Sequence, residues 1–393
     1  CPDRRAAQST RARFFAVGGV TVKLLLIDTD EIHRYSLGAE HPMGPNRVDA
    51  ALKLSHQLGI LDAFEVSQPE GATDEILELV HSKAYIQATR ANQSNPQFGI
   101  GTVDNPVAPG LADVAGRISS GTLDATRAVW EGTADRAVNL AGGLHHAFPD
   151  SMSGFCMYND AAIAITWLLE NTNIERVAYV DFDAHHGDGV EKIFWDDPRV
   201  LTISVHESGL YLFPGSGHAH EIGGVSAAGT AINIAVSKNA RDHEWLQSIH
   251  AVVPAVLQKF APELIISQHG ADPHRLDPLT DLELSMDAMA LAYHSMSAWT
   301  EQFANGKWVA LGGGGYEPSG VSRAWTHVLG AVSKQLIDAT TKVSPNLHMG
   351  DEGVDLGALE QFSPCHVTTS QPSPALVATS RAVFPYWGLR PYG

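Results

Sequence analysis

Short runs of apolar residues alternate along the chain with longer stretches in which apolar positions recur with helical period. The helical period covers residues 161–169 and 245–260. The short runs are typical of buried strands, and they are residues 22–27, 177–180, 200–205, 264–267 and 308–311. Continuous apolar strands that alternate with helices indicate a parallel sheet covered on both faces. We therefore expect an α/β fold with a central, mostly parallel β-sheet sandwiched between helices.

Polar segments follow three of these predicted strands directly. Residues 177–180 precede DFDAHHGDG, residues 264–267 precede QHGAD, and residues 308–311 precede GGGGY. In open α/β sheets, ligands bind beyond the carboxyl ends of the strands. The three segments are therefore expected to meet at one edge of the sheet and to form a functional site there.

The composition restricts the class of protein. The 393 residues are 44% hydrophobic and 18% charged, with a formal net charge of −18. This much apolar material is enough for a large core and argues against disorder. An acidic chain is a poor match for nucleic acid and suits cationic partners such as lysine-bearing protein segments. The length permits one large α/β domain.

The cysteines and the chain ends carry less information. Cys1, Cys156 and Cys365 form neither a metal-finger pattern nor a disulfide framework, which favours the reducing cytoplasm. No apolar run approaches the roughly 20 residues that span a bilayer, so no membrane partner is expected. Residues 1–20 are interpreted as an extension before the first strand. The tail from residue 344, rich in Pro, Gly, Ser and Thr, is interpreted as loops that wrap the domain.

A metal site is predicted after the second strand. In an extended segment, Asp181, Asp183 and His185 would share one face. Asp272, after another strand, can supply a further ligand, and a set of two aspartates and one histidine leaves a position open, as in catalytic zinc sites. Such oxygen-rich ligation also suits Fe²⁺, Co²⁺ or Mn²⁺. The alternative is that these are polar strand ends without a ligand.

Two further segments offer catalytic groups. His145 and His146 follow two glycines, and one imidazole facing a metal-bound water could accept its proton. Asp181 and Asp188 are candidates to orient the two rings. Tyr316 follows four glycines that lack the Lys-Ser or Lys-Thr of a phosphate-binding loop, so its hydroxyl is a candidate oxyanion donor. The alternatives are that the two histidines lie in a core turn and that Tyr316 is a tyrosine packed in the core.

These segments together resemble the histone deacetylase family. The resemblance covers residues 22–330, and its blocks are HPMGPNRV, LVHSKAYI, GGLHHAFPDSMSGFCMYNDAA, VAYVDFDAHHGDGVEKIFWDDPRVLTISVHESG, SQHGADPHRLDPLTDL and LGGGGY. The blocks GGLHH, YLFPGSG and HGADPHRLDPL are most similar to the bacterial acetoin-utilisation branch. The resemblance implies a single-domain arginase/deacetylase-like fold with about eight strands. The catalytic domain would span residues 21–335, and residues 336–393 would pack on it or wrap it.

The resemblance also assigns roles residue by residue. It implies Asp183, His185 and Asp272 as ligands of Zn²⁺, with Fe²⁺ possible, His146 as general base, and His145 as its neighbour near the leaving amine. Tyr316 would be the oxyanion donor. The acyl-lysine tunnel and its rim would be formed by Gly154, Phe155, Phe213, Leu279 and Asp104. A structural K⁺ would be bound by Asp181, Asp183, His185, Ser204 and Val205. Leu144 and His269 stand where relatives often carry Trp and a hydrophobic residue.

The implied reaction is hydrolysis of the acetyl amide of N6-acetyl-lysine in proteins, with acetylated substrates such as metabolic acyl-CoA synthetases. An acetylpolyamine amidohydrolase would favour an acidic residue where this chain has Leu279. A scaffold that binds acetyl-lysine without cleaving it would lack a ligand or the tyrosine. An arginase-type ureohydrolase would need the additional aspartates of a two-metal site, and a single compatible site is visible.

Overall fold

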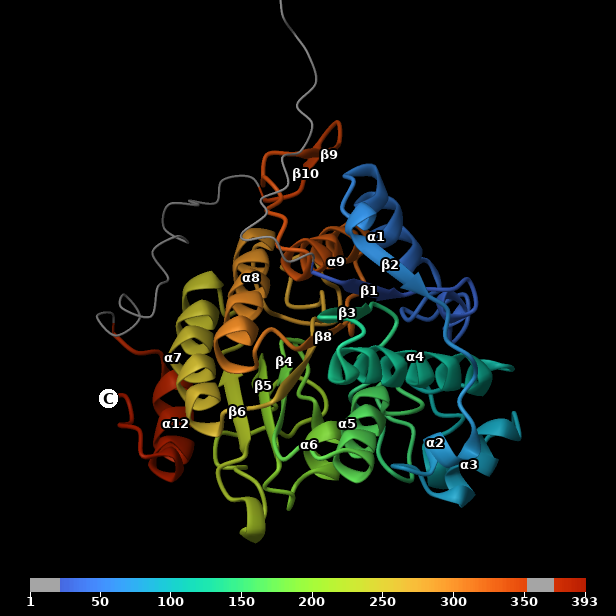
Figure 1. Cartoon of the computed structure of the whole chain (residues 1–393), viewed down its shortest axis with the longest axis horizontal. Coiled ribbons are helices and arrows are strands. Elements are labelled where there is room, and N and C mark those ends of the chain that lie inside the picture. The colour runs from blue at the N-terminus through green and yellow to red at the C-terminus, as the bar shows by residue number, and fades with distance from the viewer. Residues whose placement is uncertain (1–21, 352–370) are drawn as a thin grey trace, which may run out of the picture.

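The computed structural model describes residues 22–351 and 371–393. Its centre is a sheet of eight strands in the order β2-β1-β3-β8-β7-β4-β5-β6, and all neighbouring strands run parallel (Figure 1). The strands are β1 (Leu24–Ile27), β2 (Phe64–Ser67), β3 (Arg136–Asn139), β4 (Val177–Asp181), β5 (Val200–Glu207), β6 (Ala231–Val236), β7 (Leu264–Gln268) and β8 (Trp308–Leu311). The predicted fold class is confirmed.

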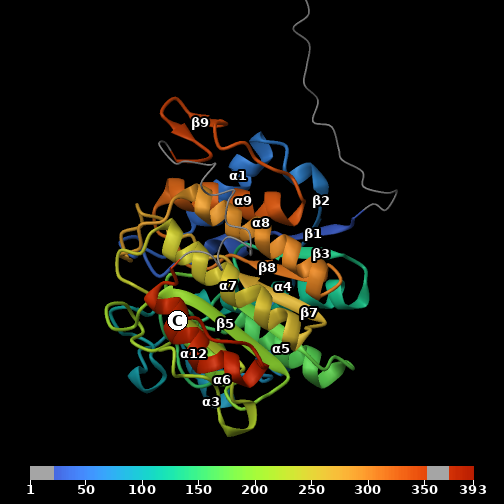
Figure 2. The same cartoon turned by 90° about the vertical axis from the view of Figure 1, so that its left-hand side faces the viewer.

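Helices cover both faces of this sheet. Packed with one face are α1 (Asn46–Gln57), α7 (Asp242–Phe260), α8 (Met286–Phe303), α9 (Pro318–Val332) and α12 (Pro374–Val383), of which α7, α8 and α12 lie in front in Figure 2. Packed with the other face are α3 (Lys83–Arg90), α4 (Leu111–Glu131), α5 (Asp160–Asn171) and α6 (Asp188–Ile193), with α2 (Asp74–Leu77) beside α3 and α4.

The side chains of β4 show why its sequence is apolar throughout. Ala178 and Val180 belong to the core on one face, whereas Val177 and Tyr179 belong to the core on the other. All four are buried, since both faces of a central parallel strand are covered by helices. The polar residues then begin at Asp181, where the strand reaches the carboxyl edge of the sheet.

The tail differs from the loops expected from its composition. It contains a small hairpin, β9 (Lys342–Ser344) with β10 (Leu347–His348), and the helix α12. The side chain of Ser373 caps α12 by accepting the Leu376 N–H, and Pro374 occupies the first turn, where a missing N–H is tolerated. The helix packs on α7 and β6. The extension predicted for residues 1–20 lies outside the described residues.

Across residues 22–351 and 371–393, none of the helices combines the length and the apolar character that crossing a membrane requires.

Candidate metal centre and active site

The three predicted metal ligands lie together at the carboxyl edge of the sheet. Nδ1 of His185 is 3.1 Å from an oxygen of Asp183 and 3.0 Å from an oxygen of Asp272. All three residues are buried, and their ligand atoms lie within 4.8 Å of one another. Tetrahedral zinc with bonds of about 2.0–2.1 Å places its ligand atoms about 3.3 Å apart. The spacing of the donor atoms therefore fits a small divalent cation.

The rest of the site holds one oxygen of each carboxylate and leaves the other facing His185. Oδ2 of Asp183 accepts hydrogen bonds from Gln268 Nε2 at 2.6 Å and from the Gly314 N–H at 2.8 Å. Oδ1 of Asp272 accepts from the Ala184 N–H at 2.9 Å. A Cβ at Gly314 would lie 2.2 Å from Asp272 Oδ2, so this close approach of backbone to ligand requires glycine. The glycine-rich turn after β8 thus orients metal ligands as well as presenting Tyr316.

The electrostatics of the cluster favour a bound cation. Burial, reinforced by the charge of Asp183, raises the pKa of Asp272 to about 7. Burial lowers the pKa of His185, but its bonds to the two carboxylates outweigh burial and raise that pKa to about 10. Two adjacent carboxylates without water are costly unless a positive charge sits between them. A divalent metal would supply that charge and displace the proton.

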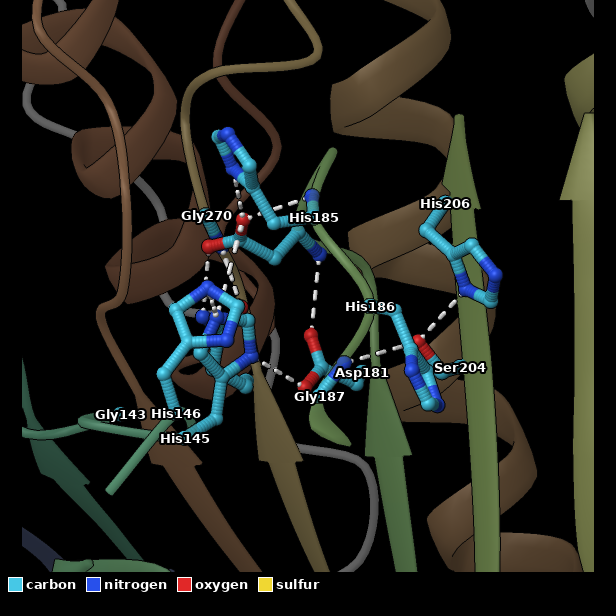
Figure 3. Close-up of polar contacts among 12 residues, drawn as sticks. Gly143, His145, His146, Asp181, His185, His186, Gly187, Ser204, His206 and Gly270 are labelled. Atoms are coloured by element: carbon cyan, nitrogen blue, oxygen red, sulfur yellow. Dashed lines mark hydrogen bonds and ion pairs between the residues drawn. The ribbon is translucent and has the colours of Figure 1, made fainter. Parts of the chain in front are cut away.

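His145 and His146 are each held by a carboxylate. Nδ1 of His145 is 2.7 Å from Asp181 Oδ2, a contact drawn in Figure 3, and Nδ1 of His146 is 2.6 Å from Asp188 Oδ1. The Nε2 atoms of the two rings are 3.0 Å apart. A carboxylate behind an imidazole fixes its tautomer and its orientation. The structure therefore brings together both predicted pairs.

The pKa values of the two histidines are shifted in opposite directions. Burial lowers the pKa of His145, but the charges of Asp181 and Asp183 outweigh burial and raise it to about 9. Burial, together with the positive charge of His145, lowers the pKa of His146 to about 4. The surroundings therefore favour the charged form of His145 and the neutral form of His146. A neutral imidazole can accept a proton, and a cationic one can stabilise negative charge or donate.

The loop that carries these histidines is fixed by two residues that sequence reasoning missed. The carboxylate of Asp160 accepts from the N–H groups of Gly143 and Leu144 at 3.0 Å and 2.8 Å. The side-chain amide of Asn159 donates to the His145 carbonyl at 3.3 Å. Asn159 is also the cap of α5. An Asn-Asp pair before an apolar helix is a capping signal in the sequence, and here the same pair also anchors the catalytic loop.

Tyr316 lines a small cavity of about 40 Å³ together with His145, His146, Asp183 and His185. Its ring centroid lies 5.8 Å from that of Phe155. Burial and the charge of Asp272 raise the pKa of Tyr316 well above its usual value. The hydroxyl therefore keeps its proton and can act as a hydrogen-bond donor inside the cavity.

Asp277 is a positioning residue that the sequence did not suggest. Its carboxylate accepts from the Tyr316 N–H at 2.6 Å and from the Leu279 N–H at 3.0 Å.

Asp277→Asn would place an amide NH₂ against one of these two backbone donors. We expect kcat to fall by about 10-fold or more, as when groups that orient a metal site are altered, with metal content unchanged. Asp281→Asn, a change in the same loop, is the control; equal kcat for both variants would contradict this role.

Two phenylalanines flank the catalytic groups. The Phe213 ring lies 5.1 Å from the His146 ring and 6.4 Å from the His185 ring, and Phe213 is 45% exposed. Gly154 lies between these groups, because a Cβ there would be 2.3 Å from His146 and 2.9 Å from Phe213. Phe155 beside Tyr316 and Phe213 beside His146 therefore place aromatic rings on two sides of the candidate catalytic groups.

Comparisons with known proteins agree with this geometry. Residues 41–332 match the model of the histone deacetylase domain. The chain belongs to the histone deacetylase family. The acetoin utilization protein AcuC of Bacillus subtilis (strain 168) is 39% identical over 302 residues, which cover 75% of this chain and 78% of AcuC. The AcuC of Staphylococcus xylosus is 34% identical over 307 residues, covering 76% and 80%.

Solved structures show the same fold. A histone deacetylase homolog from Aquifex aeolicus superposes with a TM-score of 0.74 at 31% identity, over 81% of this chain and 86% of that one. A histone deacetylase homolog complexed with SAHA gives a TM-score of 0.73 at 31% identity, covering 82% of this chain and 87% of that chain. This deacetylase-family chain is thus a hydrolase related to the AcuC proteins.

Three further residues that the sequence singles out in this deacetylase-family chain are Asp104, Leu279 and His269. Asp104 is exposed on a loop, and its carbonyl lies 3.2 Å from Nε2 of His41. Leu279 is partly buried in the loop that follows Asp272, and its place on the tunnel wall stays a prediction. Burial lowers the pKa of His269 to about 3, so this residue is a neutral core histidine bonded to Ser267.

The residues predicted to bind K⁺ surround the turn after β4. Asp181 pairs in register with Ser204, and the Ser204 hydroxyl lies 3.4 Å from the Gly187 N–H and 2.9 Å from Nδ1 of His206 (Figure 3). Val205 follows Ser204 in the same strand, β5. Asp183 and His185 complete the predicted set, and the binding of K⁺ stays a prediction.

Proposed function

We propose that this chain hydrolyses the acetyl amide of N6-acetyl-lysine in proteins and releases acetate, with a divalent metal bound by Asp183, His185 and Asp272. The observation that carries this proposal is that two of the buried donors, Asp183 and His185, line the same cavity as His146 and Tyr316, while the third, Asp272, lies 3.0 Å from His185. Zn²⁺ suits the donors, and Fe²⁺ is the alternative that oxygen-rich ligation allows.

Each protein group has a distinct task in this reaction. The metal would polarise the acetyl carbonyl and lower the pKa of the attacking water. His146, oriented by Asp188, accepts the proton of that water. Tyr316 donates to the oxygen on which negative charge develops. His145, oriented by Asp181, stabilises charge beside the pair and returns a proton to the leaving lysine amine.

The rim supports a polypeptide substrate over a polyamine. Three of the four loops with predicted substrate-binding residues also expose a large apolar side chain: Val103 beside Asp104 is 93% exposed, Leu210 near Phe213 is 73% exposed, and Leu276 near Leu279 is 57% exposed. Apolar side chains can cover the residues that flank an acetyl-lysine, but they offer nothing to a second ammonium group. Acetylated metabolic enzymes such as acyl-CoA synthetases are substrates of this class.

The test compares kcat/KM for an acetyl-lysine peptide and for N-acetylspermidine. We expect the unmodified protein to prefer the peptide. Leu279→Glu should shift the ratio toward the polyamine, because a carboxylate at the mouth can pair with a distal ammonium. Leu279→Gln, which is polar but uncharged, is the control and should leave the ratio nearly unchanged. Faster cleavage of N-acetylspermidine by the unmodified protein would overturn the lysine proposal.

A further inference from the structure

His41 contacts two of the predicted substrate-binding residues at once, Asp104 and Phe155. Its Nε2 lies 3.2 Å from the backbone carbonyl of Asp104, on the exposed loop. Its Nδ1 accepts the Met43 N–H at 3.0 Å. Its ring meets the ring of Phe155 at right angles, with centroids 4.5 Å apart and an interplanar angle of 86°. His41 opens the HPMGPNRV segment, whose role the proposed reaction leaves unexplained.

Both ring nitrogens of His41 are used by the neutral form. Because Nδ1 accepts from Met43, the proton of a neutral ring sits on Nε2 and is donated to the Asp104 carbonyl. Burial lowers the pKa of His41, and its bond and charge contacts with Asp104 oppose this lowering. Asp104 is the charged neighbour that acts on the ring. The geometry therefore defines one tautomer with two different partners.

Phe155 needs such a support. Its φ of 69° lies in the left-handed region, which is unfavourable for a phenylalanine and persists only where neighbours enforce it. Its N–H donates to Asn105 Oδ1 at 3.0 Å, and its carbonyl accepts from the Tyr35 hydroxyl at 2.8 Å. These bonds hold the backbone, whereas the His41 ring contacts the phenyl ring itself. His41 therefore restrains the part of Phe155 that faces the substrate path.

The loop that carries Asp104 is anchored at one end by Asn105, whose side chain accepts the Phe155 N–H at 3.0 Å and donates to the Met152 carbonyl at 3.4 Å. The Gly101 N–H donates to the Asn105 carbonyl at 2.7 Å, and the Asn105 N–H donates to the Thr102 hydroxyl at 3.0 Å. Both bonds stay within the loop. The bond from His41 ties Asp104 to a segment 63 positions earlier in the chain. Losing this bond would loosen the exposed residues 101–104, while the Asn105 side chain still anchors the end of the loop and the metal centre stays undisturbed.

We propose that His41 is a positioning residue with two separate effects on substrate recognition. Its Nε2–H holds the rim loop against which the polypeptide flanking the acetyl-lysine lies. Its ring holds Phe155 against the lysine stem. This inference rests on the proposed function, since it assigns the rim to a polypeptide and the aromatic wall to an acyl-lysine.

Two variants of His41 separate the effect on the rim loop from the effect on Phe155. Each is assayed on two substrates, a peptide that contains acetyl-lysine and a single acetyl-lysine with blocked termini. His41→Phe keeps a ring against Phe155 but cannot donate to Asp104. We expect it to raise KM for the peptide by about 5-fold, the loss of one net hydrogen bond, with kcat and the single-residue substrate nearly unchanged. His41→Gln keeps a donor and loses the ring, so it should weaken both substrates. Equal losses on both substrates in His41→Phe, or no loss in either variant, would overturn the proposal.

A second readout does not depend on catalysis. Hydrogen–deuterium exchange in peptides covering residues 99–107 should be faster in His41→Phe, because the bonds at Gly101 and Asn105 open more often when the loop is released. Exchange in β4 and the metal content should match the unmodified protein. If the unmodified protein cleaves neither substrate, the proposed function fails while exchange still tests His41. Unchanged exchange in residues 99–107 would overturn the positioning role.

Discussion

Asp183→Ala, His185→Ala and Asp272→Ala should each abolish amide hydrolysis and remove most of the bound metal. Each change deletes one of the three donors whose atoms lie within 4.8 Å of one another. With two donors left, the site keeps too few ligands to hold a cation at its usual affinity. Metal analysis of the purified variants, together with acetate release from an acetyl-lysine peptide, measures both effects.

The matched control for these variants is a buried aspartate outside the site. Asp287 is buried at the start of α8, where its carboxylate accepts the Asp351 N–H at 2.8 Å. Asp287→Asn changes a buried carboxylate by one functional group and should keep both metal and activity. Stoichiometric metal in all three alanine variants would contradict the ligand assignment. Metal loss in Asp287→Asn as well would show that the alanine effects come from general instability.

Tyr316→Phe should lower kcat by about 10²-fold or more while metal content and substrate binding stay nearly the same. Tyr316 lines the cavity with two of the predicted metal ligands, Asp183 and His185, and the raised pKa of its hydroxyl keeps it protonated as a donor. Removing one oxyanion donor costs about 10²–10³-fold in kcat in hydrolases with this chemistry. Steady-state kinetics on the acetyl-lysine peptide separates kcat from KM.

A second tyrosine tests whether the loss of a buried hydroxyl is enough to produce this effect. Tyr158 is fully buried, and its hydroxyl contacts the Thr89 hydroxyl away from the cavity. Tyr158→Phe should therefore lower thermal stability slightly and leave kcat unchanged. If Tyr316→Phe turns over as fast as the unmodified protein, Tyr316 is a structural residue and another donor stabilises the oxyanion.

The central strands could be predicted from the sequence because burial on both faces leaves a continuous apolar run. This holds for β8, β7, β4 and β5, which are consecutive neighbours in the sheet. β2 was missed because it is an edge strand with exposed positions, and β3 because its four residues include Arg136 and Asn139. β6 was missed although it is apolar, since Asn233 interrupts the run.

The structure brings the three predicted metal ligands together, although the predicted reason for their shared face is incomplete. Asp181 ends β4, and the segment after it is a loop rather than an extended strand. Asp183 and His185 are positioned by side chain to backbone bonds, in which the Asp183 N–H donates to Asp181 at 3.0 Å and the His185 N–H donates to Asp183 at 3.0 Å. Such local bonds of aspartate bend the chain so that alternate side chains still gather.

The residues that orient the site could not be predicted from spacing. Asp277, Gln268 and His41 are polar residues in separate segments, and their partners are identified only once the topology places those segments together. A buried carboxylate or amide that accepts backbone N–H groups leaves no periodic signal in the sequence. These residues therefore follow from the structure, whereas the predicted catalytic and metal-binding groups are concentrated after strands and can be predicted from the sequence.

The proposed function requires that this chain remove acetyl groups from lysine with a metal held by Asp183, His185 and Asp272. The most direct measurement is acetate release from an acetyl-lysine peptide by one protein sample before chelation, after chelation, and after addition of Zn²⁺ or Fe²⁺. We expect activity that disappears with the metal and returns with about one metal ion per chain. Unchanged acetate release by the metal-free protein, or none from the protein with one metal bound, would contradict the account.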